Sequence, residues 1–263
     1  MAETAPLIPE QRRETIVGHL ERERVLSYHQ LTKLLGVSHM TVRRDVSVLA
    51  EQGRVTATPG GAKLASRLLA EPSRAEKASV DVAEKRAIAE SAAGLVRDDM
   101  TVYLDAGTTV QAMRPFLEGV SGLTVVTNDL ATVQAFLDHP TVDLICIGGR
   151  VEKSNLSTMG RLTRLALAEL SLDLAFISSS SWDLAHGVTT PVEAKIEAKR
   201  AAVAASESSV LVADSSKYGR FGKYRVLRLD EFDVVVTDDE LPEAEADLLR
   251  DAGVELVQAP GRS

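Results

Sequence analysis

The sequence has few cysteines, few aromatic residues and no long apolar run. Cys146 is the only cysteine among its 263 residues, so no disulfide can form within the chain. No apolar run approaches the roughly 18–20 residues that span a bilayer, and the N-terminal residues lack the basic and apolar regions of a signal peptide. We therefore expect a cytoplasmic protein. Because Cys146 lies within the apolar run VDLICIG, we expect a small buried side chain rather than a reactive thiol.

The sequence also lacks the spacing of a metal site. Its five histidines are scattered, and it contains no His-x3-His pair and no cysteine pair. We therefore predict no metal ion and no cofactor. Aromatic residues make up only 4 % of the chain, and we expect Trp182 and Tyr218 to pack in a pocket wall or core rather than to catalyse a reaction.

The acidic charge is confined to the C-terminal part of the chain. The net charge of −8 argues at first against a nucleic-acid partner. Residues 1–62, however, hold eight Lys and Arg against seven Asp and Glu, a net charge of +1, whereas residues 63–263 carry −9. Because +1 is a weak electrostatic footprint, DNA binding would require local clustering of arginines and an oligomer that doubles the contacts.

The first 60 residues have the pattern of three helices followed by a hairpin. One periodic stretch opens at Pro9, and a second lies between Ser27, a typical N-cap, and Gly36, a typical residue after a helix end. A turn of about three residues then leads to Ser38, which caps a third helix ending at Gly53. Two helices joined by a short glycine-containing turn are typical of a helix-turn-helix motif.

A short strand and a glycine-rich turn follow the third helix. Residues 54–58 have the composition of a strand, and Pro59, Gly60 and Gly61 have that of a tight turn. This pattern predicts a β-wing beside the helices. We interpret residues 8–63 as a winged helix-turn-helix domain.

The helix that begins at Ser38 has a core face and an outward face. Val42, Val46 and Leu49 have helical spacing and are expected to face the core. In a helix-turn-helix motif, the first residues of the second helix reach base edges, and arginine can bind guanine or phosphate. We expect Asp45 to orient arginine side chains or to cap a neighbouring helix. The candidate DNA-binding residues are Ser38, His39, Thr41, Arg43, Arg44, Gly60 and Gly61.

The rest of the chain has the pattern of an α/β domain. Residues 64–80 show no clear strand pattern, and we interpret them as a linker, partly helical. Beyond them, short apolar strands alternate with helices, which is typical of a mostly parallel sheet covered on both faces. The expected strands are TVYLD, LTVVT, VDLICIGG, LDLAFIS, SVLVAD, FDVVVTD and VELVQA. We therefore predict an α/β fold class, in which residues 81–263 form a larger effector-sensing domain.

Small and polar residues follow several of these strands. Ligands of open parallel sheets bind at the carboxyl ends of the strands. The clusters at such ends are residues 105–109 (DAGTT), 127–129 (TND), 148–150 (GGR) and 214–217 (DSSK). The first cluster opens a helix, whose free backbone N–H groups suit a phosphate. Each cluster alone is an ordinary turn between a strand and a helix, but together they favour an anionic, hydroxylated ligand.

The helix-turn-helix region resembles the DeoR family of transcription regulators. The family signature combines an arginine and spaced apolar residues with a small residue, threonine, arginine and aspartate further along. The matching residues are Arg12, Ile16, Leu20, Ser38, Thr41, Val42, Arg43, Arg44, Asp45 and Val46. Gly60, Gly61 and Ala62 also resemble the family, whereas Pro59 stands where its members usually have histidine.

The C-terminal part resembles the DeoR-family sensor domain, which is similar to sugar-phosphate isomerases such as ribose-5-phosphate isomerase. The matching segments are DAGTT, TND, GGR, DSSK and the stretch from Gly187 to Arg200. The resemblance implies a phosphorylated sugar or related metabolite as effector. The residues that would then hold the phosphate are Asp105, Gly107, Thr108 and Thr109, and those that would contact or frame the sugar are Asn128, Arg150, Lys199, Asp214 and Lys217. The run from Ser178 to Trp182 replaces the family's usual glycine-containing loop, which would reshape the pocket.

We therefore predict a DNA-binding transcription regulator without enzymatic activity. By the resemblance, it is a repressor of carbohydrate-metabolism genes that binds double-stranded operator DNA as a homo-oligomer, a dimer or a tetramer, with no membrane partner. One alternative is a sugar-phosphate isomerase fused to a DNA-binding domain, with Asp105, Asp214 or Lys217 as its base, although the isomerase's Lys-Gly-rich catalytic segment is absent. Another is a winged-helix interaction module in which the Arg-Arg-Asp run is only a solvated helix face.

Overall fold

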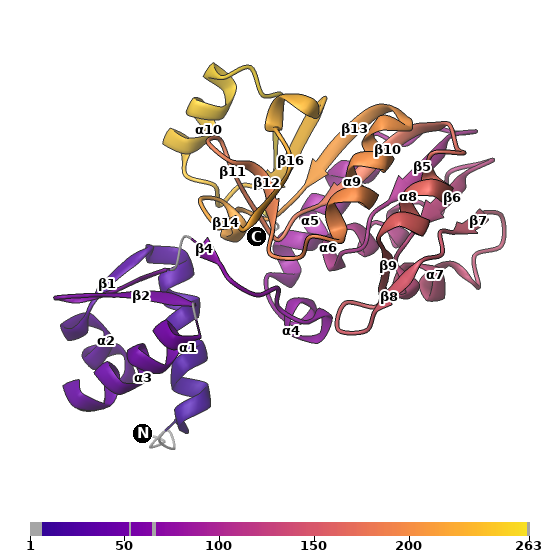
Figure 1. The fold of residues 1–263 in the computed structure, drawn as a ribbon. Helices are drawn as coiled ribbons and strands as arrows, with labels where there is room; N and C mark the ends of the chain where they lie inside the picture. The colour runs from indigo at the N-terminus through magenta and orange to yellow at the C-terminus, as the bar shows by residue number, and fades with distance from the viewer. Residues whose placement is uncertain (1–6, 53, 65–66, 262–263) are drawn as a thin grey trace. The chain divides into compact units, whose positions relative to one another are not determined.

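The computed structural model describes residues 7–52, 54–64 and 67–261. The chain divides into two compact units, Met1–Leu69 and Ala70–Ser263, both drawn in Figure 1. Gly53, the expected end of the third helix, and residues 65–66 of the expected linker lie outside the described residues. The boundaries 8–63, 64–80 and 81–263 stay a prediction, because compactness does not show where an independently folding domain ends.

The N-terminal unit contains three helices and a small antiparallel sheet. The helices are α1 (Pro9–Glu23), α2 (Tyr28–Leu35) and α3 (His39–Glu51), and the strands are β1 (Val25–Ser27), β2 (Val55–Thr58) and β3 (Gly61–Leu64). The strands pair in the order β1-β3-β2. The three helices and the hairpin of β2 and β3 confirm the sequence prediction. Strand β1 was not predicted, because three residues are too few to show an alternating pattern.

Side-chain caps fix the turn between α2 and α3. The Gln30 N–H donates to Ser27 Oγ at 3.1 Å where α2 begins, and the Thr41 N–H donates to Ser38 Oγ at 3.2 Å where α3 begins. Gly36 ends α2 with a φ of 64°, a left-handed conformation that glycine adopts without strain. These caps leave only the segment 36–38 between the two helices, as the helix-turn-helix motif requires.

The core of the N-terminal unit comes from all three helices and the sheet. Its fully buried side chains include Ile16, Leu20, Leu31, Val42, Val46 and Leu49. The last three confirm the predicted core face of α3. Because that face is fixed against α1 and α2, the opposite face of α3 is held outward.

The C-terminal unit is built on a seven-stranded parallel sheet. Its strands are β5 (Thr101–Leu104), β6 (Thr124–Thr127), β7 (Asp143–Cys146), β10 (Leu172–Ser178), β13 (Ser206–Val212), β16 (Val234–Asp238) and β17 (Leu256–Ala259). They pair in the order β17-β16-β13-β10-β5-β6-β7, and every pairing is parallel. All seven strands were predicted from their apolar runs.

Helices cover both faces of this sheet (Figure 1). Those on one face are α5 (Val82–Ala93), α6 (Thr108–Gln111) and α7 (Leu130–Phe136), and those on the other are α8 (Arg161–Leu167), α9 (Lys195–Ala204) and α10 (Glu243–Asp251). In β5, Val102 and Leu104 pack in one core while Tyr103 packs in the other. Burial on both faces explains why the strands are continuous apolar runs.

Several short elements interrupt the alternation of strands and helices. They are β4 (Arg67–Leu68), α4 (Arg74–Ala78), β8 (Arg150–Glu152), β9 (Ser157–Met159), β11 (Ser181–Asp183), β12 (Gly187–Thr190), β14 (Phe221–Gly222), β15 (Tyr224–Leu227) and the 3-10 turns Arg114–Phe116, Ser215–Lys217 and Leu229–Glu231. Strands β8 and β9 form a hairpin, and β11, β12 and β15 form an antiparallel sheet. Their brevity left no periodic signal in the sequence.

The prediction of a buried Cys146 was wrong. Cys146 is exposed at the carboxyl end of β7, which is the last strand of the sheet and has a neighbour, β6, on one side only. An apolar run therefore indicated the strand correctly but not its place at the edge. In the described part of the chain, no helix is long and apolar enough to cross a bilayer.

Candidate functional site

The outward face of α3 presents a polar and cationic surface. Ser38, His39, Arg43 and Arg44 are exposed, and Thr41 is partly exposed. The Arg43 guanidinium lies 5.2 Å from the ring centroid of Tyr28. This cation–π contact positions the arginine without neutralising it. The face therefore has the hydrogen-bond donors that contact phosphates and base edges.

Asp45 does not pair with the arginines of this face. It points to the opposite side of α3, where its carboxylate accepts the Arg12 Nε–H at 2.8 Å and the Arg12 Nη2–H at 3.3 Å. Asp45 therefore orients an arginine side chain, as expected, but that arginine is Arg12 of α1. No ion pair is formed by Arg43 or Arg44 with any other residue that the structure describes, so their charges stay available to a ligand.

The two predicted wing glycines have different environments. Gly60 is exposed at the hairpin turn, and its carbonyl accepts the Tyr28 N–H at 2.9 Å. Gly61 is buried, and a Cβ added there would lie 2.1 Å from the Leu26 carbonyl oxygen. The close approach of β1 and β3 thus requires glycine at position 61, and of the two predicted glycines Gly60 is the one on the surface of the wing.

In the C-terminal unit, two neighbouring hollows lie at the carboxyl ends of the central strands. The first holds about 250 Å³ of empty space, part of it open to solvent, and is lined by Asp105, Ala106, Asn128, Ser157, Thr158, Met159, Lys195, Ala198 and Lys199. The second is lined by Glu71, Lys77, Ala106, Gly107, Thr108, Thr109, Ser178, Ser179, Ser180, Lys195, Lys199 and Lys217. The shared residues Ala106, Lys195 and Lys199 join the two hollows into one polar site.

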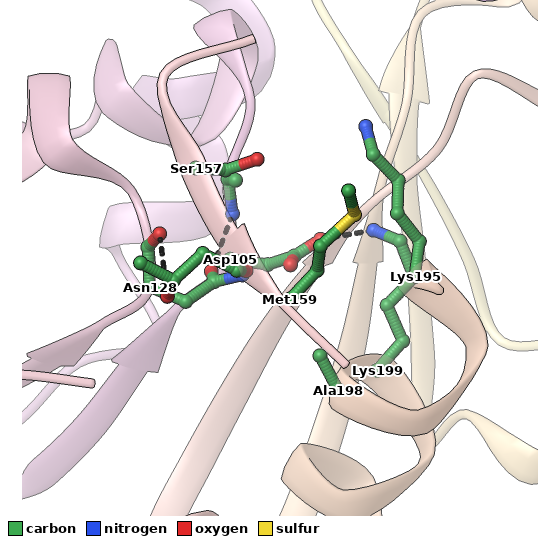
Figure 2. A pocket seen from close by; sticks show the side chains of 9 residues that line it. Asp105, Asn128, Ser157, Met159, Lys195, Ala198 and Lys199 are labelled. Carbon is green, nitrogen blue, oxygen red and sulfur yellow. Dashed lines mark hydrogen bonds and ion pairs between the residues drawn. The ribbon is translucent and has the colours of Figure 1, made fainter. Parts of the chain in front are cut away.

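Asp105 and Lys199 form the centre of this site. Figure 2 shows the Lys199 side chain reaching from α9 to the Asp105 carboxylate, which follows β5. Ser178, at the end of β10, donates its backbone N–H to the same carboxylate oxygen at 2.9 Å, and its carbonyl accepts from Lys199 Nζ at 2.8 Å. Both charged side chains are buried and mutually neutralised, which satisfies the demand that buried charges be paired.

Asn128 is held by hydrogen bonds on both sides of its amide. Its Oδ1 accepts from the Tyr103 hydroxyl at 2.8 Å and from the Ala106 N–H at 3.1 Å, and its Nδ2 donates to the Thr158 carbonyl at 2.8 Å. Burial, with the nearby Asp105, raises the pKa of Tyr103 well above its usual value, so the hydroxyl remains a donor. Asn128 therefore fixes the turn after β5 and frames the first hollow.

The second hollow is lined with lysines and hydroxyl groups. Lys195 Nζ donates to Glu71 Oε2 at 2.6 Å, and Lys77 Nζ donates to Glu71 Oε1 at 2.8 Å. Burial would raise the pKa of Glu71, but the two lysines outweigh it and lower that pKa to about 2. Burial, together with the like charge of Lys195, lowers the pKa of Lys77 to about 8 against the opposing effect of Glu71.

A further ion pair closes one side of the second hollow. Lys217 Nζ lies 2.8 Å from Asp214 Oδ2, and the Asp214 side chain is 1 % exposed. Burial opposes ionisation of Asp214, but Lys217 and Ser216 keep the pKa of this carboxyl below its usual value. The Trp182 indole N–H donates to the Asp214 carbonyl at 3.2 Å, and its ring contacts Tyr218 edge-on with centroids 4.8 Å apart. These aromatic residues pack behind the site.

The structure gathers most of the predicted effector residues but not all of them. Those at the two hollows are Asp105, Gly107, Thr108, Thr109, Asn128, Lys199 and Lys217, with Asp214 paired to the last. Arg150 is exposed on β8 and lines neither hollow. The expected phosphate-binding helix, α6, has only four residues, so its terminus adds little dipole to the site.

Sequence reasoning missed several lining residues. Lys195 lies four residues before Lys199 on α9, a spacing that places both on one helix face. Glu71 and Lys77 come from the stretch interpreted as linker, where nothing in the local pattern indicates a pocket. Ser178, Ser179 and Ser180 belong to the run that was expected to reshape the pocket, and all three line the second hollow.

Two family models match this chain. The DeoR-like helix-turn-helix domain matches residues 12–67, and the DeoR C terminal sensor domain matches residues 80–239. Both matches agree with the resemblance seen in the sequence.

Curated relatives cover nearly the full length of the chain. An uncharacterized HTH-type transcriptional regulator of Haemophilus influenzae is 38% identical over 95% of this chain and 97% of its own length. The uncharacterized HTH-type transcriptional regulator YgbI of Escherichia coli is 41% identical over 90% of this chain and 93% of its own length. The HTH-type transcriptional repressor GlcR of Bacillus subtilis is 32% identical over 94% of this chain and 95% of its own length. All three are named as regulators of transcription.

Proposed function

The chain belongs to the DeoR family of DNA-binding transcription regulators, and we propose that it is a repressor released by a phosphorylated sugar or related metabolite. In this proposal α3 binds operator DNA in the major groove, and the two hollows of the C-terminal unit bind the effector. The chain is a regulator rather than an enzyme, as its relatives are. The 32% identical GlcR, named a repressor, supports repression.

The charge of the C-terminal site carries the proposal of an anionic effector. Four lysines line the second hollow, and three buried carboxylates pair with them, which leaves a net charge of +1. The C-terminal part of the chain is otherwise strongly acidic. A cationic hollow is therefore a local feature there, and it favours an anionic ligand. The lysines are Lys77, Lys195, Lys199 and Lys217, and the carboxylates are Glu71, Asp105 and Asp214.

Each side chain has a proposed role in holding the effector. Gly107, Thr108 and Thr109 offer backbone N–H groups and hydroxyls to a phosphate, and the lysines offer charge. Asp105, Asn128 and Asp214 are already engaged in hydrogen bonds or ion pairs, so they frame the site. Arg150 is not part of the proposed site because it lines neither hollow.

The isomerase alternative is not favoured. A catalytic base must be free to accept a proton from the sugar. Asp105 accepts from Lys199 and from Ser178, while Asp214 is paired with Lys217, and Lys217 with it. The three residues that could act as the base are therefore committed to one another or to their neighbours.

The N-terminal surface supports sequence-specific binding by an oligomer. With a net charge of +1 over residues 1–62, one unit cannot hold DNA by bulk electrostatics. Two copies would present two α3 helices to half-sites about one helical turn apart. We therefore propose that the regulator binds DNA as a homo-oligomer.

A DNA-binding titration tests the proposed function. Purified protein is titrated onto fluorescent DNA from upstream of its own gene, with random DNA as control, and then challenged with a panel of sugar phosphates and the matching free sugars. The expected result is preferential binding to the upstream DNA and its loss with one phosphorylated sugar only. Equal binding to random DNA, or equal release by free and phosphorylated sugars, would contradict the proposal.

A further inference from the structure

One carboxylate in the C-terminal unit is shared by two lysines. Each oxygen of Glu71 accepts from a different ammonium, that of Lys77 or that of Lys195, and the Glu71 side chain is 6 % exposed. Lysine ammonium groups also bind phosphates, as point charges. The Glu71 carboxylate thus occupies an anion position that is already formed in the protein.

Glu71 differs from the other carboxylates of the site in its support. Asp105 directly follows β5 and Asp214 lies two residues after the end of β13, so the central sheet fixes the positions of both. Glu71 lies in neither a helix nor a strand, three residues before α4. It is therefore the carboxylate of the cluster that can leave with the least loss of regular structure.

The segment just after Glu71 is anchored independently. Arg74 Nη1 donates to Asp129 Oδ1 at 3.0 Å, Arg74 Nη2 donates to Gln111 Oε1 at 2.6 Å, and the Arg74 N–H donates to the Ser154 carbonyl at 2.9 Å. These contacts hold α4 in place whether or not Glu71 stays between the lysines. The segment before Glu71 has a different connection, since Ala70 begins this unit and the chain before it leads to the helix-turn-helix unit.

We propose that Glu71 is a built-in competitor of the effector, occupying the position between Lys77 and Lys195 that the effector's anionic group takes when it binds. This inference rests on the proposed function, because it assigns two more residues and a mode of regulation to the same site. A phosphate monoester carries about −1.5 to −2 charges at neutral pH. It matches two lysines better than the single negative charge of Glu71 does, so it can displace the carboxylate.

Displacement of Glu71 gives the effector a route to the DNA-binding unit. A ligand shifts an equilibrium only by its difference in affinity for the two states. In one state Glu71 lies between the two lysines and excludes the effector's anionic group. In the other state Glu71 is released and the anionic group can bind. Release frees Ala70 and Glu71, through which the chain is joined to the helix-turn-helix unit, while Ser73 remains the N-cap of α4.

Calorimetric titration with inorganic phosphate tests the competition. The full-length proteins compared are the unaltered chain, Glu71→Gln and Glu207→Gln, a matched loss of one charge at an exposed residue near the amino end of β13. We expect Glu71→Gln to bind phosphate about tenfold more tightly, because the competing state is weakened. Glu207→Gln is expected to bind as the unaltered protein does.

The outcomes separate this inference from the proposed function. Equal affinities for Glu71→Gln and Glu207→Gln, with phosphate binding about tenfold weaker in Thr108→Val, would overturn the competition and leave the effector site standing. Phosphate binding by none of the proteins would overturn both.

Discussion

Asp45 of α3 and Arg12 of α1 form a two-pronged ion pair with side chains only 4% and 13% exposed. The pair joins the helix that presents Arg43 and Arg44 to the first helix of the unit. Its carboxylate faces away from the surface proposed to meet DNA, where it would repel phosphate. Asp45 is therefore a positioning residue for α3.

Removal of this carboxylate is expected to destabilise the N-terminal unit. Asp45→Ala leaves the Arg12 guanidinium largely buried without its counter-charge, which costs about 3–5 kcal/mol. Denaturant unfolding followed by circular dichroism measures the loss. If the pair acts as a unit, Arg12→Ala lowers the free energy of unfolding much less in the Asp45→Ala background than in the unaltered protein. Additive losses would show that the two residues act separately.

The wing glycines are expected to differ in their tolerance of alanine. Gly61→Ala places a Cβ 2.1 Å from the Leu26 carbonyl oxygen, so β1 and β3 must separate. We expect a loss of roughly 2 kcal/mol in the free energy of unfolding. Gly60→Ala meets nothing within 4 Å and is the matched control. Similar stabilities of the two variants, measured by thermal melting, would contradict the packing role of Gly61.

The sequence predicted the regular parts of this fold well. The seven sheet strands are short, mostly apolar runs, and the caps Ser27, Gly36 and Ser38 mark the helix ends by their residue types. The edge position of β7 was not predictable, because an apolar run does not show how many neighbours its strand has. Strand order depends on contacts distant in sequence, which local patterns do not encode.

Residue patterns alone predicted the candidate site only in the clusters that follow strands, and Lys199 on α9 came from the family resemblance. Asp105, Asn128 and Lys217 were found in these clusters. Glu71 and Lys77 were missed because they reach the site from an irregular segment through contacts distant in sequence. Arg150 followed a strand in the same way but lines neither hollow, since the hairpin of β8 and β9 takes it elsewhere.

Thr108 offers a test of the effector site with little risk to the fold. Its side chain is partly exposed in the second hollow, so Thr108→Val is expected to change the free energy of unfolding by no more than about 0.5 kcal/mol. Loss of one phosphate ligand is expected to weaken phosphate binding about tenfold. Unchanged phosphate affinity, by calorimetry, would remove Thr108 from the proposed site.

Phosphate affinity is expected to fall as the pH rises through about 8. Burial and the charge of Lys195 lower the pKa of Lys77 to about 8, so Lys77 is cationic below that pH and neutral above it. Lys77→Arg keeps its charge throughout, and its affinity relative to the unaltered protein should increase above this pH. Calorimetry between pH 6.5 and about 9.5 gives that ratio, in which the ionisation of phosphate itself cancels. A ratio independent of pH would contradict a role for Lys77 in anion binding.

The central claim is that the outward face of α3 reads DNA, and a binding titration of Arg43→Ala and Arg44→Ala against the unaltered protein tests it most directly. Fluorescence anisotropy is recorded with upstream DNA and with random DNA over a range of salt concentrations, and Arg54→Ala, which removes an arginine paired with Glu14, is the control. Loss of an arginine that reads a base is expected to weaken binding by about 1–3 kcal/mol on upstream DNA and by much less on random DNA. Loss of an arginine that contacts phosphate is expected to weaken binding to both DNAs and to lower the salt dependence. If both variants bind upstream DNA as tightly as the unaltered protein, α3 is a solvated face and the account is wrong.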